Sequence, residues 1–78
     1  MAKRITNEEA AWNLKELATL RGNAEAREYA ARAIVELQYA AGAGSSTRGW
    51  AKRSSAARNM ARARKLLEEA GQPQEAAA

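Results

Sequence analysis

The sequence contains no cysteine, no histidine and no aspartate, so every acidic residue is a glutamate. Without cysteine the chain has no disulfide and no zinc–thiolate site. Without histidine it has no imidazole base, and the Ser-His-Asp and Cys-His catalytic sets are excluded. The glutamates form no cluster along the sequence that suggests a metal site. We therefore expect a protein that acts by binding, not an enzyme, and we predict no catalytic residue, no cofactor and no metal.

Strand-forming residues and long apolar segments are also scarce. The chain has one valine, two isoleucines, two tyrosines and no phenylalanine. Alanine, glutamate, arginine, lysine and leucine dominate, and these residues favour helices. No apolar run approaches the roughly 20 residues that span a bilayer, and no apolar segment of the secretory type follows the first charges. We predict an all-α protein, located in the cytoplasm and without a membrane-spanning segment.

Alanine is the most abundant residue, with 21 of the 78 positions, in a chain long enough for one domain. A buried alanine loses almost no side-chain entropy but contributes little apolar area. Ordering a chain costs roughly 1.5 kcal/mol per residue, which a core this thin barely offsets. We therefore expect a marginal monomer that associates as a homodimer or completes its folding on a partner.

Capping residues predict a helical hairpin in the first half of the chain. The first helix covers about residues 7–21, because Thr6 and Glu9 have the spacing of a capping box. Gly22 favours its end, and Asn23 can cap a second helix over about residues 24–41. Because only two residues separate these helices, they should form a tight antiparallel hairpin.

The second half of the chain predicts a flexible linker followed by a basic helix. Residues 42–49 contain three glycines and three Ser or Thr residues, which is typical of a flexible connection. The third helix covers about 50–70, with Thr47 or Ser54 and Ser55 as alternative starts. Gly71 and Pro73 favour its end, and we predict a disordered tail over 72–78. The residues predicted to share the apolar faces are Ala10, Leu14, Leu17, Ala18 and Arg21; then Ala26, Ala30, Ala33, Ile34, Leu37 and Ala41; then Ala56, Met60, Ala63, Leu67 and Ala70.

Charge is segregated along the chain. Residues 1–41 hold six basic and six acidic side chains, residues 42–67 hold seven basic and no acidic ones, and residues 68–78 hold three acidic ones. In the third helix Arg58, Arg62 and Lys65 have the spacing of a single helix face. Arginine and lysine neutralise phosphates with release of counterions, and an aromatic ring can stack on an exposed base. The leading hypothesis is a protein that binds DNA or RNA through Arg48, Trp50, Lys52, Arg53, Arg58, Arg62 and Lys65.

The alternative interpretation of the basic helix is a solvated face, balanced locally by Glu68 and Glu69. No known recognition motif supports nucleic-acid binding. The predicted connection before the third helix is too long for a helix-turn-helix.

Three large apolar residues do not fit a helix with one apolar face. Trp12 lies nearly opposite Leu14, and Val35 and Tyr39 share a stripe opposite Leu37. Each has a structural interpretation, in which Trp12 covers the edge of the core and Tyr39 packs on Trp50. Together they predict a protein interface for an acidic partner surface or a second copy. The second function hypothesis is therefore an adaptor or inhibitor of the kind that phages and plasmids direct at host factors.

Overall fold

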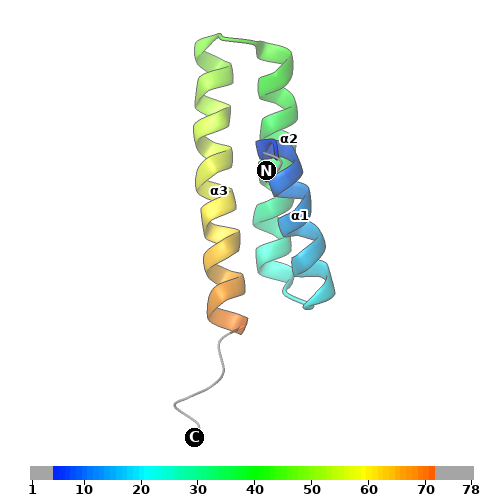
Figure 1. The fold of residues 1–78 in the computed structure, drawn as a ribbon. Coiled ribbons are helices and arrows are strands. Elements are labelled where there is room, and N and C mark those ends of the chain that lie inside the picture. The colour runs from blue at the N-terminus through cyan, green and yellow to red at the C-terminus, as the bar shows by residue number, and fades with distance from the viewer. Residues whose placement is uncertain (1–4, 72–78) are drawn as a thin grey trace, which may run out of the picture.

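The computed structural model describes residues 5–71, which form three helices and no strand (Figure 1). Helix α1 spans Asn7–Leu20, α2 spans Ala24–Ala43 and α3 spans Thr47–Gly71. The prediction of an all-α fold with three helices is confirmed. The predicted tail over 72–78 lies outside the described residues.

Side-chain caps fix the starts of the first two helices. The hydroxyl of Thr6 accepts a hydrogen bond from the Glu9 N–H at 3.1 Å, and the Glu9 carboxylate accepts one from the Thr6 N–H, also at 3.1 Å. The amide oxygen of Asn23 accepts from the Ala26 N–H at 3.0 Å. Each bond satisfies a backbone donor that the first turn leaves without a helical partner. The predicted capping box and the Asn23 cap are both confirmed.

The connection between α2 and α3 is much shorter than predicted. Helix α2 continues through Ala43 and α3 begins at Thr47, so only residues 44–46 separate them. Gly44 ends α2 with a φ of +64°, a conformation that glycine adopts without strain. The Ser46 hydroxyl accepts a hydrogen bond from the Gly49 N–H at 3.1 Å. The prediction of a flexible linker over 42–49 was wrong, because Ser46 caps a helix instead of extending a linker. Of the alternative starts of the third helix, Thr47 is confirmed.

Helices α2 and α3 form a long antiparallel hairpin, and α1 packs back along α2 (Figure 1). Helix α1 contacts α2 extensively but α3 only slightly. Because α1 is much shorter than its neighbours, the end of the hairpin at the turn over 44–46 extends beyond it (Figure 1). One face of the hairpin is therefore covered by α1 along part of its length only.

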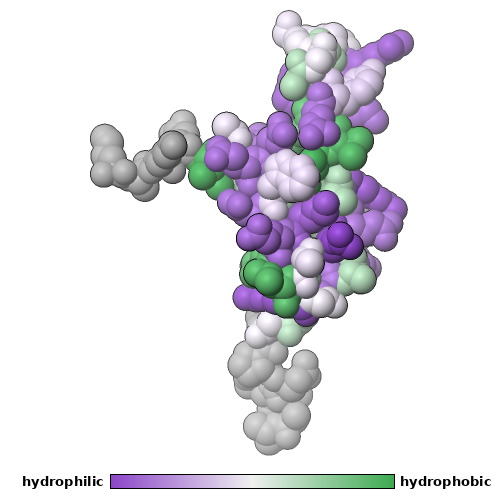
Figure 2. All heavy atoms as spheres, turned by 90° about the vertical axis from the view of Figure 1, so that its right-hand side faces the viewer, coloured by the Kyte–Doolittle hydropathy of each residue, from purple (hydrophilic) through white to green (hydrophobic). Residues whose placement is uncertain are grey.

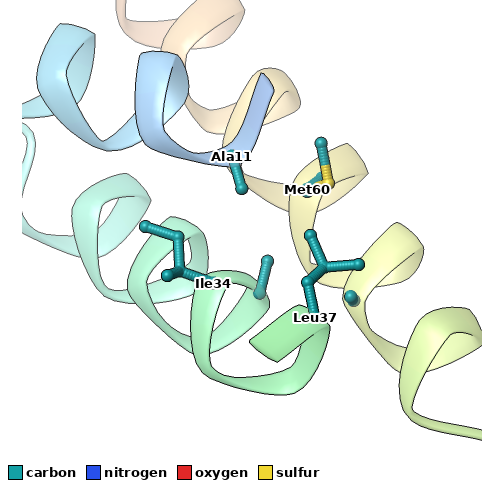
Figure 3. Packing of buried hydrophobic residues seen from close by; sticks show 6 residues of the cluster. Ala11, Ile34, Leu37 and Met60 are labelled. Atoms are coloured by element: carbon teal, nitrogen blue, oxygen red, sulfur yellow. The ribbon is translucent and has the colours of Figure 1, made fainter. Parts of the chain in front are cut away.

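Alanine dominates the core, as its abundance predicts. Eight of the twelve buried apolar residues are alanine, so the helices pack through close backbone approach more than through large side chains. Ile34 and Leu37 of α2 meet Ala11 of α1 and Met60 of α3 in the larger cluster (Figure 3). A smaller cluster joins all three helices through Ala18, Ala26 and Leu67.

The predicted apolar faces are largely confirmed. In α1, however, the buried face is turned about the helix axis relative to the predicted one. In α2 five of six predicted residues are buried, and Ala40 replaces the exposed Ala41. In α1 Leu17 is 37% exposed while Ala11 is fully buried; Arg21 is exposed as well. Ala11 and Ala18 lie seven residues apart, so they face α2 together and allow the close approach that a leucine would prevent. At the end of α3 Ala70 is exposed, whereas Gly49 is buried near its start.

Two helical glycines give a matched test of the close approach at the turn between α2 and α3. A Cβ on Gly49 would lie 2.6 Å from the Gly44 carbonyl oxygen, whereas one on Gly42 would meet nothing within 4 Å. We expect Gly42→Ala to raise the free energy of unfolding by about 0.5–1 kcal/mol, because alanine favours helix. Gly49→Ala should lower it despite the same gain in helix propensity. Thermal unfolding followed by circular dichroism measures both, and equal stabilisation by the two substitutions would contradict the close approach of Gly49 to the Gly44 carbonyl in the turn.

Candidate functional site

The basic residues of the third helix are all exposed and lie on one continuous helix. This group comprises Arg48, Lys52, Arg53, Arg58, Arg62, Arg64 and Lys65. Within residues 5–71 the single ion pair joins Arg32 to Glu28, both on α2, at 2.6 Å. In that part of the chain, therefore, no carboxylate pairs with a cation of α3.

Five of the six predicted basic site residues share the half of α3 that faces away from α1. Lys52 lies over the Tyr39 ring at 5.6 Å, and the Arg62 guanidinium lies 5.8 Å from the centroid of Tyr29, so both approach α2. Arg48 shares their side because it lies four residues before Lys52. Arg58 and Lys65 lie next to Arg62, at helical spacing, toward solvent. We call this set the basic strip: Arg48, Lys52, Arg58, Arg62 and Lys65.

Arg53 and Trp50, the other two predicted nucleic-acid contacts, lie apart from the basic strip. The Arg53 guanidinium donates a hydrogen bond to the Gly44 carbonyl oxygen at 3.0 Å, which ties α3 to the end of α2. Arg53 also lines a small hollow with Asn7 of α1, so it lies on the side that α1 covers. Trp50 is 65% exposed. Because it precedes Lys52 by two residues, it points about 200° away from the side that approaches Tyr39.

The packing of Tyr39 on Trp50, which the sequence allowed, is therefore replaced by packing of Tyr39 on Lys52. The prediction assumed that Trp50 stood in a linker that folds back. In the structure Trp50 lies in the first turn of α3, where the helix directs it away from Tyr39.

On the side opposite α1, the edges of α2 and α3 form a continuous polar and aromatic surface that we call the open seam. Its residues from α2 are Tyr29, Arg32, Glu36 and Tyr39, and those from α3 are Lys52, Ser55, Asn59 and Arg62. Both sets have spacings of three, four and three residues, so each forms one edge of its helix. Their antiparallel register pairs Tyr39 with Lys52, Glu36 with Ser55 and Tyr29 with Arg62.

Glu36 holds the centre of the open seam. Its carboxylate accepts one hydrogen bond from the Ser55 hydroxyl and another from the Asn59 amide, the latter at 2.6 Å. All three side chains are half-buried. Because a charged acceptor strengthens a hydrogen bond and burial reduces competition by water, this cluster stabilises the register of the hairpin.

Beside this cluster lies an open groove of about 590 Å³. Its walls come from α2 and α3, namely Glu28, Ala31, Arg32, Val35, Glu36, Ser55 and Asn59. Sequence reasoning missed five open-seam residues as site residues, namely Tyr29, Arg32, Glu36, Ser55 and Asn59. The three-four-three spacing in each helix was visible in the sequence, but the pairing of the two edges depends on the register of the folded hairpin.

The predicted protein-interface residues are exposed but separated. Trp12 is 46% exposed on α1 with the Lys15 ammonium 4.9 Å from its ring, and Val35 and Tyr39 are 64% and 47% exposed on α2. Figure 2 looks onto the side of α1 and α2 away from α3 and shows a mostly hydrophilic surface with separate hydrophobic patches. These three residues therefore do not form one broad apolar surface.

Comparisons with known proteins add no functional assignment. No protein-family model, no curated protein and no solved structure matches the chain. Within residues 5–71, no helix combines the length and the hydropathy of a membrane span. In the same range, no three His, Cys, Asp or Glu side chains gather where they could hold a metal ion.

The Glu36 cluster generates a stability prediction with a control on the same helix. Glu36→Ala leaves the Ser55 hydroxyl and the Asn59 amide without their acceptor, so we expect a loss of about 1–3 kcal/mol in unfolding free energy. Glu28→Ala removes only an exposed ion pair on one helix and should change it by about 0.5 kcal/mol or less. Urea unfolding followed by circular dichroism measures both. Equal effects of the two substitutions would show that the cluster does not stabilise the hairpin.

Proposed function

We propose that this protein binds nucleic acid, with the basic strip of α3 contacting the phosphates. The observation that carries the proposal is the arrangement of the strip. Five cations lie on one side of one exposed helix, and within residues 5–71 no carboxylate forms an ion pair with any of them. A polyanion would supply the missing counter-charge, with release of its own condensed cations.

The dimensions of the strip suit an extended polyanion. From residue 48 to residue 65 a straight helix advances about 26 Å, at about 1.5 Å per residue. Phosphates of one strand follow one another by roughly 3.4 Å along the axis of a duplex, so several lie within this length. Lys52 and Arg62 rest on tyrosine rings, which reduces the side-chain entropy that phosphate binding would cost.

The second hypothesis, a protein interface through Trp12, Val35 and Tyr39, has less support. Interfaces with strong binding residues are usually contiguous and exclude water around a central anchor. Here charged side chains such as Lys15 and Glu28 accompany the exposed apolar ones. Recognition of an acidic protein surface by the basic strip, and association as a homodimer, stay predictions.

We expect the triple substitution Arg48→Ala, Arg58→Ala and Lys65→Ala to weaken binding strongly, because it removes three of the five cations of the basic strip. The substitution leaves the tyrosine contacts of Lys52 and Arg62 in place. Fluorescence anisotropy with labelled duplex DNA, single-stranded DNA and structured RNA, at several salt concentrations, measures the effect. On duplex DNA the slope of log affinity against log salt should become shallower by about 0.9 for each phosphate that the variant no longer neutralises.

The matched control is Lys15→Ala, Arg21→Ala and Arg27→Ala on α1, α2 and the turn between them. Both triple variants lower the formal net charge from +4 to +1. The control should keep most of the affinity, since charges more than about 10 Å apart are largely screened at 0.1 M salt. Equal reductions of affinity in the two variants would show that net charge alone causes binding. No binding by the native protein at low salt would contradict the proposal.

A further inference from the structure

The open seam shares two cations with the basic strip, and its shape limits the kind of nucleic acid that fits. Lys52 and Arg62 lie between α3 and α2, where they approach Tyr39 and Tyr29. A ligand that contacts these cations together with the tyrosine rings must therefore lie across both helices. Packed helices lie about 8–10 Å apart and each has a diameter of about 10–12 Å. The binding surface is then roughly 18–22 Å wide.

This width does not fit the major groove of a duplex. That groove is about 12 Å wide and admits one helix. The outer ridge of α3 with Arg58 and Lys65 can follow a duplex backbone, but Lys52 and Arg62 are beside α2 and do not reach base edges in such a complex. The width of the binding surface does not exclude a single strand, because a flexible strand can follow the junction between the two helices.

The open seam also offers what unpaired bases need. Tyr39 is 47% exposed, with the Lys52 ammonium over its ring at 5.6 Å from the centroid, and Val35 next to the groove is 64% exposed. Aromatic rings beside cations are the features with which proteins bind single strands, since every base can stack and every nucleotide carries a phosphate. The base pairs of an intact duplex leave no base face free for Tyr39.

We propose that the open seam binds single-stranded nucleic acid, with an unpaired base stacked on the part of the Tyr39 ring that Lys52 leaves exposed. A phosphate next to this base binds Lys52, and a phosphate further along the strand binds Arg62, which lies about 15 Å along α3 from Lys52. The groove of about 590 Å³, which Val35 and Asn59 line together with Glu28 and Glu36, receives the next base. The two carboxylates face the uncharged base there, while the phosphates stay on the cations of α3. This inference rests on the proposed function and specifies its ligand class. Single-stranded DNA and RNA share the chemistry, so the experiment uses both.

The test compares Tyr39→Ala with Tyr39→Phe. Phenylalanine keeps the stacking ring and alanine removes it. The probes are labelled oligo-deoxythymidine, oligo-uridine and a mixed-sequence duplex. Each has about 20 nucleotides per strand, longer than the roughly 4–16 that a small single-strand-binding domain covers. Because Tyr39 is exposed, both variants should keep the native circular dichroism spectrum.

We expect the native protein to prefer at least one single strand over the duplex. Tyr39→Ala should weaken single-strand binding by about 5- to 150-fold, and Tyr39→Phe should restore most of it. Duplex binding should change little in either variant. Trp12→Ala, which removes an exposed aromatic ring from α1 outside the open seam, should leave all affinities unchanged.

Failure of this inference differs from failure of the proposed function. One contradicting result is equal binding of single strands and duplex, together with no effect of Tyr39→Ala. If the triple substitution in the basic strip still weakens binding in that case, the proposed phosphate binding stands and the single-strand site is wrong. Competition by polyglutamate as effective as that by oligo-deoxythymidine would also overturn the site, because charge alone would then explain binding. No binding of any probe at low salt would overturn both.

Discussion

The close contact between α2 and α3 is the constraint on which the rest of the molecule depends. Buried alanines make up most of the core between the helices. At the turn that joins α2 and α3, Gly49 lies so near the Gly44 carbonyl that a Cβ would collide with it. Each alanine buries little apolar area, at roughly 25 cal/mol per Å². Stability therefore depends on keeping many small contacts in register, and the caps at Ser46 and Gly44 place the two helices so that this register is reached.

The same constraint produces the surface that we assign to ligand binding. When the centre of a helix pair is filled by alanine, the larger side chains at its edges extend across the junction instead of into it. On the side without α1 these are tyrosines and cations at both ends, with Glu36, Ser55 and Asn59 between them. The polar cluster fixes which edge residues face each other, so it positions Lys52 by Tyr39 and Arg62 by Tyr29. The packing of the core and the arrangement of the candidate site thus both follow from the register of α2 against α3.

Much of the fold could be predicted from the sequence, because its local signals agree. The capping box at Thr6, the cap at Asn23 and the apolar spacing of α2 each depend on residues within one or two turns. Ser46 could not be assigned in this way, since a serine among glycines fits a linker as well as a cap. The cations of α3 could also be identified from the sequence. Which of them belong to the basic strip could not be predicted. Which half of α3 faces away from α1 depends on the side of the α2–α3 hairpin on which α1 packs, and this is decided by contacts between helices, not by residues close together in the sequence.

The order of charges within α3 opposes the dipole of this helix. A helix is stabilised by acidic residues in its first turn and basic residues in its last turn, by about 0.3–1 kcal/mol each. Helix α1 follows this rule with Glu8 and Glu9 at its start. Helix α3 has no acid in its first turn, no base in its last, and carries Arg48 near its start and Glu68 and Glu69 near its end. Features that oppose local stability are expected at functional positions. A polyanion along the basic strip would offset both the dipole and the mutual repulsion of the cations, so the unfavourable order of charges is itself an argument for an anionic ligand.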